Sequence, residues 1–350
     1  MYSQKAKLAL TLSFITGIGD KTVKSLIRNF GSLNEIQSSE MKNLTLILNN
    51  KNVQRTYSLV NNSMEIKTAQ EKAYHVLKLS DMHGISLLCT DDNDYPLNLK
   101  LAEDCPAVLY VKGNMEVHNS IFQIAVVGTR KPDKNGLTIA GRISGAFSEY
   151  GFVIVSGLAA GIDTAAHNSA LDSGAKTIAV MGTNLIDSEI YPRQNFVLAK
   201  QILESGGSWI SETAPGVKCD KKVFYFRNRI QSGLSLATIP VQCDIKSGTM
   251  RTVKYATGQR RAVFAPVPSE NSVNSYRGNE EIITNHSALG IKDKSDYPVI
   301  AETLTEFGRQ LHKNKGICLV SEKYENEIRY VKLEPEYEKR KSYFSYILNI

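Results

Sequence analysis

Apolar positions recur at helical spacing through the first part of the chain, for example Val23, Leu26, Ile27 and Phe30. A polar, asparagine-rich stretch at 43–63 interrupts this pattern, which then resumes. The pattern predicts a small all-helical N-terminal domain over residues 1–82.

From residue 83 the pattern changes to short apolar runs that alternate with helical stretches. The predicted strands cover 85–89, 107–111, 121–127, 152–155, 177–181, 209–210, 236–241 and 262–265, and the predicted helices cover 137–149, 163–171, 193–203 and 249–255. Such alternation indicates βαβ units, and therefore an α/β fold with a mostly parallel sheet and helices on both faces. We place this core at 83–295. The periodicity fades beyond Asp296, so 296–350 is predicted to be a C-terminal extension of unknown role.

Composition narrows the class of protein. The 350 residues are 42% hydrophobic and 22% charged, as in ordinary globular proteins. No apolar run approaches the roughly 18 residues of a membrane span. The five cysteines form no CxxC pair, which argues against a disulfide framework or a zinc site. These features predict a cytoplasmic protein with no membrane association and no metal.

Positive charge is concentrated in one segment. Between Lys218 and Arg261, ten basic residues face only two acidic ones, so this segment carries +8 while the whole chain carries +7. Concentrated positive charge attracts polyphosphates such as nucleic acids. A solubilising basic face would have the same composition.

Three predicted strands end in glycine and small polar residues. These exits are Gly128-Thr129-Arg130, then Ser156-Gly157 running on to Gly161-Ile162-Asp163, and Gly182-Thr183-Asn184. Glycine lets the backbone approach an anion, and the start of a helix offers unpaired amides. Because carboxyl ends of parallel strands meet at one edge, the three exits favour an anion-binding site there.

The common enzyme motifs are absent from the sequence. It has no GxGxxG after the first parallel strand, no GxxxxGK[ST], no HExxH and no GxSxG. His167 stands near a predicted helix start, where a structural role is the more frequent one. We therefore predict no catalytic residue, no cofactor and no enzymatic activity.

Three aromatic residues adjoin two arginines in the segment Phe224-Tyr225-Phe226-Arg227-Asn228-Arg229. Aromatic faces stack bases and guanidinium groups hold phosphates, which is the combination that single-stranded nucleic acid requires. The alternative is that the aromatics belong to the core and the arginines pair with carboxylates. Few acidic residues are close in sequence, which favours the first interpretation.

A second candidate lies near the N-terminus, where Thr16-Gly17-Ile18-Gly19 separates two helical patterns and Lys21 and Lys24 follow. A tight turn of this kind is typical of a helix-hairpin-helix, whose amides can face a phosphate. The same turn can simply join two packed helices.

Taken in order, these segments resemble the DNA-processing protein A family, also called DprA or Smf. The resemblance runs from about residue 8 to 290. The segments that carry it are 16–19, Tyr95-Pro96, 106–113, Val127-Gly128-Thr129-Arg130, Ser156 to Asp163, Tyr191-Pro192, Ser211-Glu212, Arg227-Asn228-Arg229-Ile230, Ser232 to Ser235, and Ser247-Gly248-Thr249. The chain departs from the family pattern at Gln242, where a glutamate is usual, and no winged helix is evident after residue 300.

The resemblance implies an extended Rossmann-like core after a small helical (helix-hairpin-helix or SAM-like) domain. It also implies binding of single-stranded DNA, homodimerisation, and loading of a RecA-type recombinase during natural transformation. By motif matching and by charge, the expected DNA-binding residues are Gly128, Thr129, Arg130, Ser156, Gly157, Gly161, Asp163, Lys222, Phe226, Arg227, Asn228, Arg229 and Lys254.

Two other functions use a similar layout. One is a nucleotide phosphoribohydrolase, whose Pro-Gly-Gly-x-Gly-Thr-x-x-Glu motif is matched here only by 244–252, with Thr252 at the glutamate position. The other is a sensor of a nucleotide ligand, as in phage defence.

Overall fold

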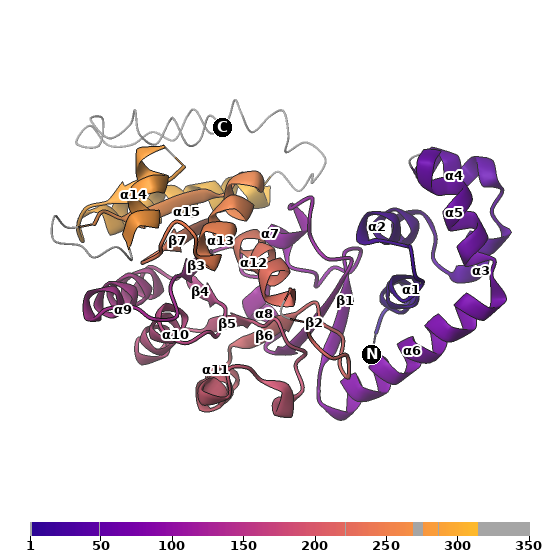
Figure 1. Cartoon of the computed structure of the whole chain (residues 1–350), viewed down its shortest axis with the longest axis horizontal. Coiled ribbons are helices and arrows are strands. Elements are labelled where there is room, and N and C mark those ends of the chain that lie inside the picture. Colours follow the sequence, from indigo (N-terminus) through magenta and orange to yellow (C-terminus); the bar gives the residue numbers. More distant parts are fainter. Residues whose placement is uncertain (1, 49, 221, 269–275, 286, 314–350) are drawn as a thin grey trace.

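The chain folds into a helical region followed by a larger α/β part (Figure 1). The structure is a computed structural model, and it describes residues 2–48, 50–220, 222–268, 276–285 and 287–313. A mostly parallel sheet with helices on both faces follows an all-helical N-terminal region, which confirms the fold class predicted from the sequence.

The described residues of the helical region form six helices: α1 (Gln4–Ser13), α2 (Asp20–Asn29), α3 (Leu33–Ser38), α4 (Met41–Ile47), α5 (Asn50–Val60) and α6 (Ser63–Met82). Local capping explains two of the starts. The Ser3 side chain accepts from the amide of Ala6, and the Asn62 side chain accepts from the amides of Met64 and Glu65. Each cap satisfies amides that have no partner within the helix.

Nine strands form one sheet in the described residues: β1 (Ser86–Cys89), β2 (Val108–Gly113), β3 (Gln123–Val127), β4 (Val153–Ser156), β5 (Thr177–Val180), β6 (Ser208–Ser211), β7 (Ala237–Pro240), β8 (Ala262–Pro266) and β9 (Leu289–Ile291). Their order is β1-β2-β6-β5-β4-β3-β7-β8-β9. The strands from β6 to β9 in this order are parallel, and β2 is antiparallel to both of its neighbours.

The helices of this part are α7 (Leu97–Lys100), α8 (Met115–His118), α9 (Lys134–Glu149), α10 (Ile162–Asp172), η1 (Asp187–Glu189), η2 (Arg193–Asn195), α11 (Phe196–Glu204), α12 (Val223–Leu234), α13 (Gly248–Gly258), α14 (Arg277–Thr284) and α15 (Asp296–Lys313). They cover both faces of the sheet. Ile154 of β4 packs in a core cluster with α9 and α10, whereas its neighbour Val155 packs in another with α7 and α12. Alternating side chains are thus buried on both sides.

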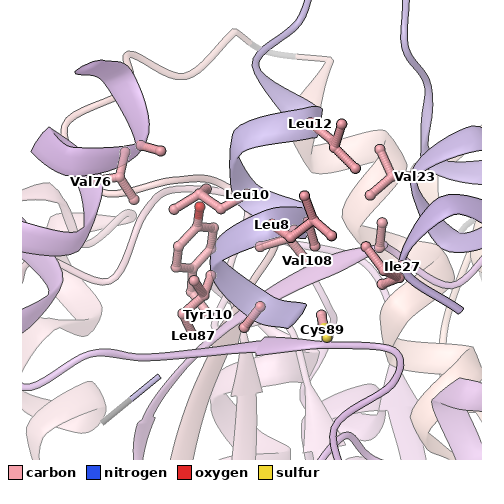
Figure 2. Packing of buried hydrophobic residues seen from close by; sticks show 14 of the residues in the cluster. Leu8, Leu10, Leu12, Val23, Ile27, Val76, Leu87, Cys89, Val108 and Tyr110 are labelled. Carbon is pink, nitrogen blue, oxygen red and sulfur yellow. The ribbon is translucent and has the colours of Figure 1, made fainter. Parts of the chain in front are cut away.

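The helical region shares a core with the edge of the sheet (Figure 2). Leu8 and Leu10 of α1 pack in one cluster with Leu87 of β1 and with Val108 and Tyr110 of β2. Helix α1 therefore packs against the antiparallel edge of the sheet.

Helix α15 begins at Asp296, where the sequence pattern was expected to fade. Its residues Tyr297, Ile300, Ala301 and Leu304 are buried in the same cluster as Ile124 of β3. The first part of the predicted C-terminal extension therefore packs onto the core. Residues 314–350, including Cys318, lie outside the described residues.

Candidate nucleic-acid interface

The candidate site lies at the carboxyl edge of the parallel strands, near the point where the order of successive strands across the sheet reverses. From β3 the chain moves through β4 and β5 to β6, and helix α12 then carries it back to β7 on the other side of β3. Ligands of such sheets bind outside the strand ends near this reversal.

The loops after β3 and β7 bind each other at this point. The amide of Thr129 donates to the carbonyl of Gln242 (2.8 Å), and the amide of Asp133 donates to the Gln242 side-chain oxygen (3.2 Å). Gln242, which replaces the usual glutamate, thus joins the two loops. Arg130 stays exposed beside this junction.

The loop after β4 is held by Asp163, which is buried. Its carboxylate accepts from the amides of Gly157 (3.1 Å) and Ala159 (3.3 Å). Burial raises the pKa of Asp163, while the charge of Arg227 and these two amides act in the opposite direction. The amides expected to face an anion are therefore occupied by a carboxylate of the protein itself, and Asp163 orders the loop before α10.

Glycine at these strand exits serves close packing. A Cβ at Gly157 would stand 1.6 Å from Nη1 of Arg227, and one at Gly128 would stand 2.5 Å from Ile162. One at Gly182 would stand 2.7 Å from the ring of Phe224. Gly161 has a φ of +85°, which a side chain rarely adopts. Three of these positions thus make room for protein side chains, a role that differs from the expected approach to an anion.

Arg227 is buried, contrary to the expectation that it faces a phosphate. Only 5% of the residue is exposed, and its Nη1 donates to the carbonyl of Val180 at the end of β5 (2.8 Å). Burial lowers the pKa of Arg227 to about 10. The charge of Asp163 acts to raise this pKa, and the charge of Arg130 acts to lower it. Arg227 is therefore charged at neutral pH and fastens α12 to the end of the sheet.

Arg229 is also paired within the protein. Its Nη2 lies 2.6 Å from a carboxylate oxygen of Glu212 and 3.7 Å from one of Asp20. Both carboxylates are distant in sequence, so the scarcity of acidic residues near 224–235 was misleading. The interpretation in which the arginines pair inside the protein holds for Arg229.

The other predicted residues divide into three groups. Ser156 is fully buried and donates to the carbonyl of Val126 (2.6 Å), and Asn228 is half-buried with its amide 3.4 Å from the carbonyl of Gly248. Lys222, Phe226 and Lys254 are exposed, as Arg130 is. Gly128, Thr129 and Gly161 are partly exposed, and Gly161 lies close to the backbone of Thr129 and Arg130.

Exposed aromatic side chains gather at the start of α12. Phe226 and Tyr225 are 54% and 43% exposed, and Tyr191, 52% exposed, packs its ring 5.5 Å from that of Phe224. The guanidinium of Arg251 on α13 lies 4.1 Å above the ring of Tyr225. We call Tyr191, Tyr225, Phe226 and Arg251 the aromatic platform. Phe226 is among the expected DNA-binding residues, and Tyr225 lies in the aromatic segment that the sequence singles out. Tyr191 and Arg251 were not expected at the site.

The predicted hairpin joins α1 to α2, and Gly17 in its turn has a φ of +102°. Arg55 of α5 covers this glycine, with Nη2 2.4 Å from the place of a Cβ. Asp20, at the start of α2, points toward Arg229 as described above. Of the two interpretations of this turn, the contacts agree with the one in which it joins packed helices.

His167 is buried and bonds with Thr177 (2.8 Å). Burial lowers its pKa to about 3, and the charge of Arg227 acts in the same direction. The imidazole is therefore neutral at physiological pH, and its hydrogen bond with Thr177 gives it a structural role.

No helix of the described residues is both long enough and apolar enough to span a membrane.

Together, the fold and the site define a Rossmann-like α/β protein that presents aromatic and cationic side chains beside the carboxyl edge of its sheet. Residues 86–300 match the family model of the DNA recombination-mediator protein A. The chain belongs to this family, which confirms the resemblance seen in the sequence.

Two relatives illustrate the similarity. Protein Smf of Synechocystis sp. is 42% identical over 201 residues, which are 57% of this chain and 50% of that protein. The DNA processing protein DprA of Bacillus subtilis is 37% identical over 201 residues, 57% of this chain and 67% of that protein. The matched part thus spans about half the length of the first relative.

Two solved structures are similar over most of their length. DprA from Streptococcus pneumoniae has a TM-score of 0.63 at 27% identity and covers 85% of this chain and 98% of its own. DNA processing protein A from Helicobacter pylori has a TM-score of 0.53 at 27% identity, covering 66% and 96%. The latter structure concerns the single-stranded DNA binding mode of that protein.

Proposed function

We propose that this chain binds single-stranded DNA through the aromatic platform and the exposed cations beside it. In this proposal the chain acts as a homodimeric, non-enzymatic mediator that helps to load a RecA-type recombinase onto incoming strands. Its place of action is the cytoplasm.

The exposure of the aromatic platform is the observation that carries the proposal. Large aromatic side chains are usually buried, and a group of them at the surface beside cations marks a binding site. Stacking of bases on such rings contributes about 1–3 kcal/mol per base, whatever the sequence. Tyr191, Tyr225 and Phe226 therefore offer stacking surfaces that an unpaired strand can use and a closed duplex cannot.

Phosphate contacts would come from exposed cations on neighbouring elements. Arg130 follows β3, Lys222 precedes α12, and Arg251 and Lys254 lie on α13. Among the described residues, none of these four side chains forms an ion pair. Their charge is thus available to a polyanion, in contrast to that of Arg229.

Family membership supports the same function. The H. pylori relative is described by its binding of single-stranded DNA, and its fold matches this chain at a TM-score of 0.53. The phosphoribohydrolase alternative lacks the glutamate of its motif. Thr252 stands at the glutamate position, is 98% buried and has no side chain that acts as an acid or base.

The test is a fluorescence-anisotropy titration with labelled single-stranded and duplex oligonucleotides over a salt series, with free nucleotides as competitors. We expect preferential binding of the single strand, with log affinity falling against log salt by about 0.7 per neutralised phosphate. Binding of a mononucleotide without binding of the strand would instead favour a nucleotide sensor. Affinity that is independent of salt would contradict the proposed phosphate contacts.

A further inference from the structure

Arg229 connects three parts of the molecule that are far apart in sequence. It lies on α12, Glu212 directly follows β6, and Asp20 is the first residue of α2 in the helical region. One guanidinium nitrogen, Nη2, lies 2.6 Å from Glu212 and 3.7 Å from Asp20. We call Asp20, Glu212 and Arg229 the arginine cluster.

Within the arginine cluster the Arg229 side chain is shielded from water, whereas the side chains of Glu212 and Asp20 are 24% and 46% exposed. The side chain of Arg229 is 11% exposed, and its Nη1 is buried without a hydrogen-bond partner. Burial raises the pKa of Glu212, and the charge of Arg229 opposes that shift. A buried guanidinium that is incompletely hydrogen-bonded depends strongly on the carboxylates that remain. Among the described residues, Asp20 and Glu212 are the two carboxylates that form ion pairs with Arg229.

Helix α12 carries both this cluster and the aromatic platform. Arg229 stands three residues after Phe226 and two after Arg227. Arg227 fastens the helix to the end of β5, and Gln259 of the segment after α13 donates to the carbonyl of Arg229 (2.9 Å) and to Asp104 (2.8 Å). These contacts fix the turn of α12 that directly follows Phe226, and therefore the direction in which Phe226 leaves the helix.

We propose that Asp20 is a positioning residue for the aromatic platform. Through Arg229, the helical region holds α12 in the orientation that presents Phe226 and Tyr225 to a strand. Asp20 itself touches no DNA in this account. The proposal rests on the proposed function, since it concerns the same site.

Substitution of Asp20 gives opposite results under two accounts. If Arg229 binds phosphate directly, Asp20→Asn removes one of its two carboxylate partners. The loss of one negative charge also favours the strand, so binding tightens. If Asp20 positions α12, the same substitution weakens binding despite the more favourable charge. The sign of the change therefore separates the two accounts.

The chain offers a matched control in Asp91. Lys5 of α1 lies 2.5 Å from Asp91, which follows β1, so this ion pair also joins the helical region to the α/β part. Asp91→Asn removes the same charge and also breaks an ion pair between the two parts. It differs from Asp20→Asn because this ion pair joins Lys5 to Asp91 and includes no residue of α12.

The experiment compares the full chain with Asp20→Asn, Asp20→Glu and Asp91→Asn by anisotropy with a labelled oligothymidylate. We expect Asp20→Asn to weaken binding by about three- to tenfold. Asp20→Glu should restore affinity, and Asp91→Asn should bind as tightly as the unmodified chain or more tightly. Equal or tighter binding by Asp20→Asn, or an equal loss with Asp91→Asn, would overturn the proposal.

A second measurement needs no DNA. Hydrogen exchange of the amides at 223–229 in the free protein should be faster in Asp20→Asn than in Asp91→Asn, because α12 loses one of its attachments. Unchanged exchange there would overturn the positioning role. If the unmodified chain binds no strand, the proposed function fails while this measurement still decides the role of Asp20.

Discussion

Arg227 and Gly157 share one space at the carboxyl edge of the sheet. The guanidinium of Arg227 lies where a side chain at residue 157 would stand, and Gly157 donates its amide to Asp163 close by. The glycine after β4 and the arginine of α12 are thus two halves of one packing arrangement. Phe226, a member of the exposed aromatic platform, directly precedes Arg227 on α12.

The first prediction concerns this shared space. Gly157→Ala should lower the free energy of unfolding by about 2 kcal/mol or more, because its Cβ would collide with the buried guanidinium. Gly258→Ala in α13 is the control, since no atom lies within 4 Å of its Cβ. Urea denaturation measures both. A Gly157→Ala protein as stable as the unmodified chain would show that Arg227 can leave this space without cost.

The second prediction separates buried from exposed arginines. Arg227→Ala should destabilise the protein by about 3 kcal/mol, because it leaves the buried Asp163 without its nearby positive charge. Arg251→Ala, at an exposed position, should leave the melting temperature nearly unchanged and weaken strand binding. Thermal unfolding and anisotropy together check this. The reverse pattern would place the DNA contact at Arg227.

Local patterns predicted the strands and the strand exits, because apolar runs and glycine turns depend on neighbours in sequence. They did not predict the partners of Arg227 and Arg229, which come from β5, β6 and α2. Helix α15 was missed although Tyr297, Ile300, Ala301 and Leu304 have helical spacing. Strand β9 has three residues, too few for an alternating pattern to appear.

The third prediction tests stacking. Phe226→Ala and Tyr225→Ala should each weaken binding of an oligothymidylate by about 1–3 kcal/mol, the loss of one stacked base. The free energy of unfolding should change little, since neither residue belongs to the buried core. Tyr74→Ala on α6 is the matched control, because Tyr74 is 65% exposed and belongs to the helical region. An equal loss with all three variants would rule out the aromatic platform as a specific surface.

The fourth prediction concerns pH. Thr177 donates to the carbonyl of Ile154 (2.6 Å), so it accepts from Nδ1 of His167 and leaves the buried Nε2 unprotonated. The pKa of His167 is lowered to about 3 in the folded protein, so the unfolded chain binds the extra proton first. Stability from this group is complete above about pH 6.5 and is lost as the pH falls toward 3.

This dependence is measured by urea denaturation between pH 7 and 4 for the unmodified chain and for His167→Gln. The difference in their free energies of unfolding should fall by about 1.4 kcal/mol per pH unit below pH 6. Other acid-sensitive groups cancel in that difference. A constant difference would mean that His167 takes up its proton equally in both states.

The central claim is that an unpaired strand lies on the aromatic platform. Photo-crosslinking of an oligonucleotide containing 5-iodouracil, followed by peptide mapping, tests it most directly because this base reacts with stacked aromatic side chains. Crosslinks at Tyr191, Tyr225 or Phe226, lost on competition with unlabelled single strand, are the predicted result. Crosslinks confined to the helical region around Gly17 to Lys24 would contradict the account and place the strand on the hairpin instead.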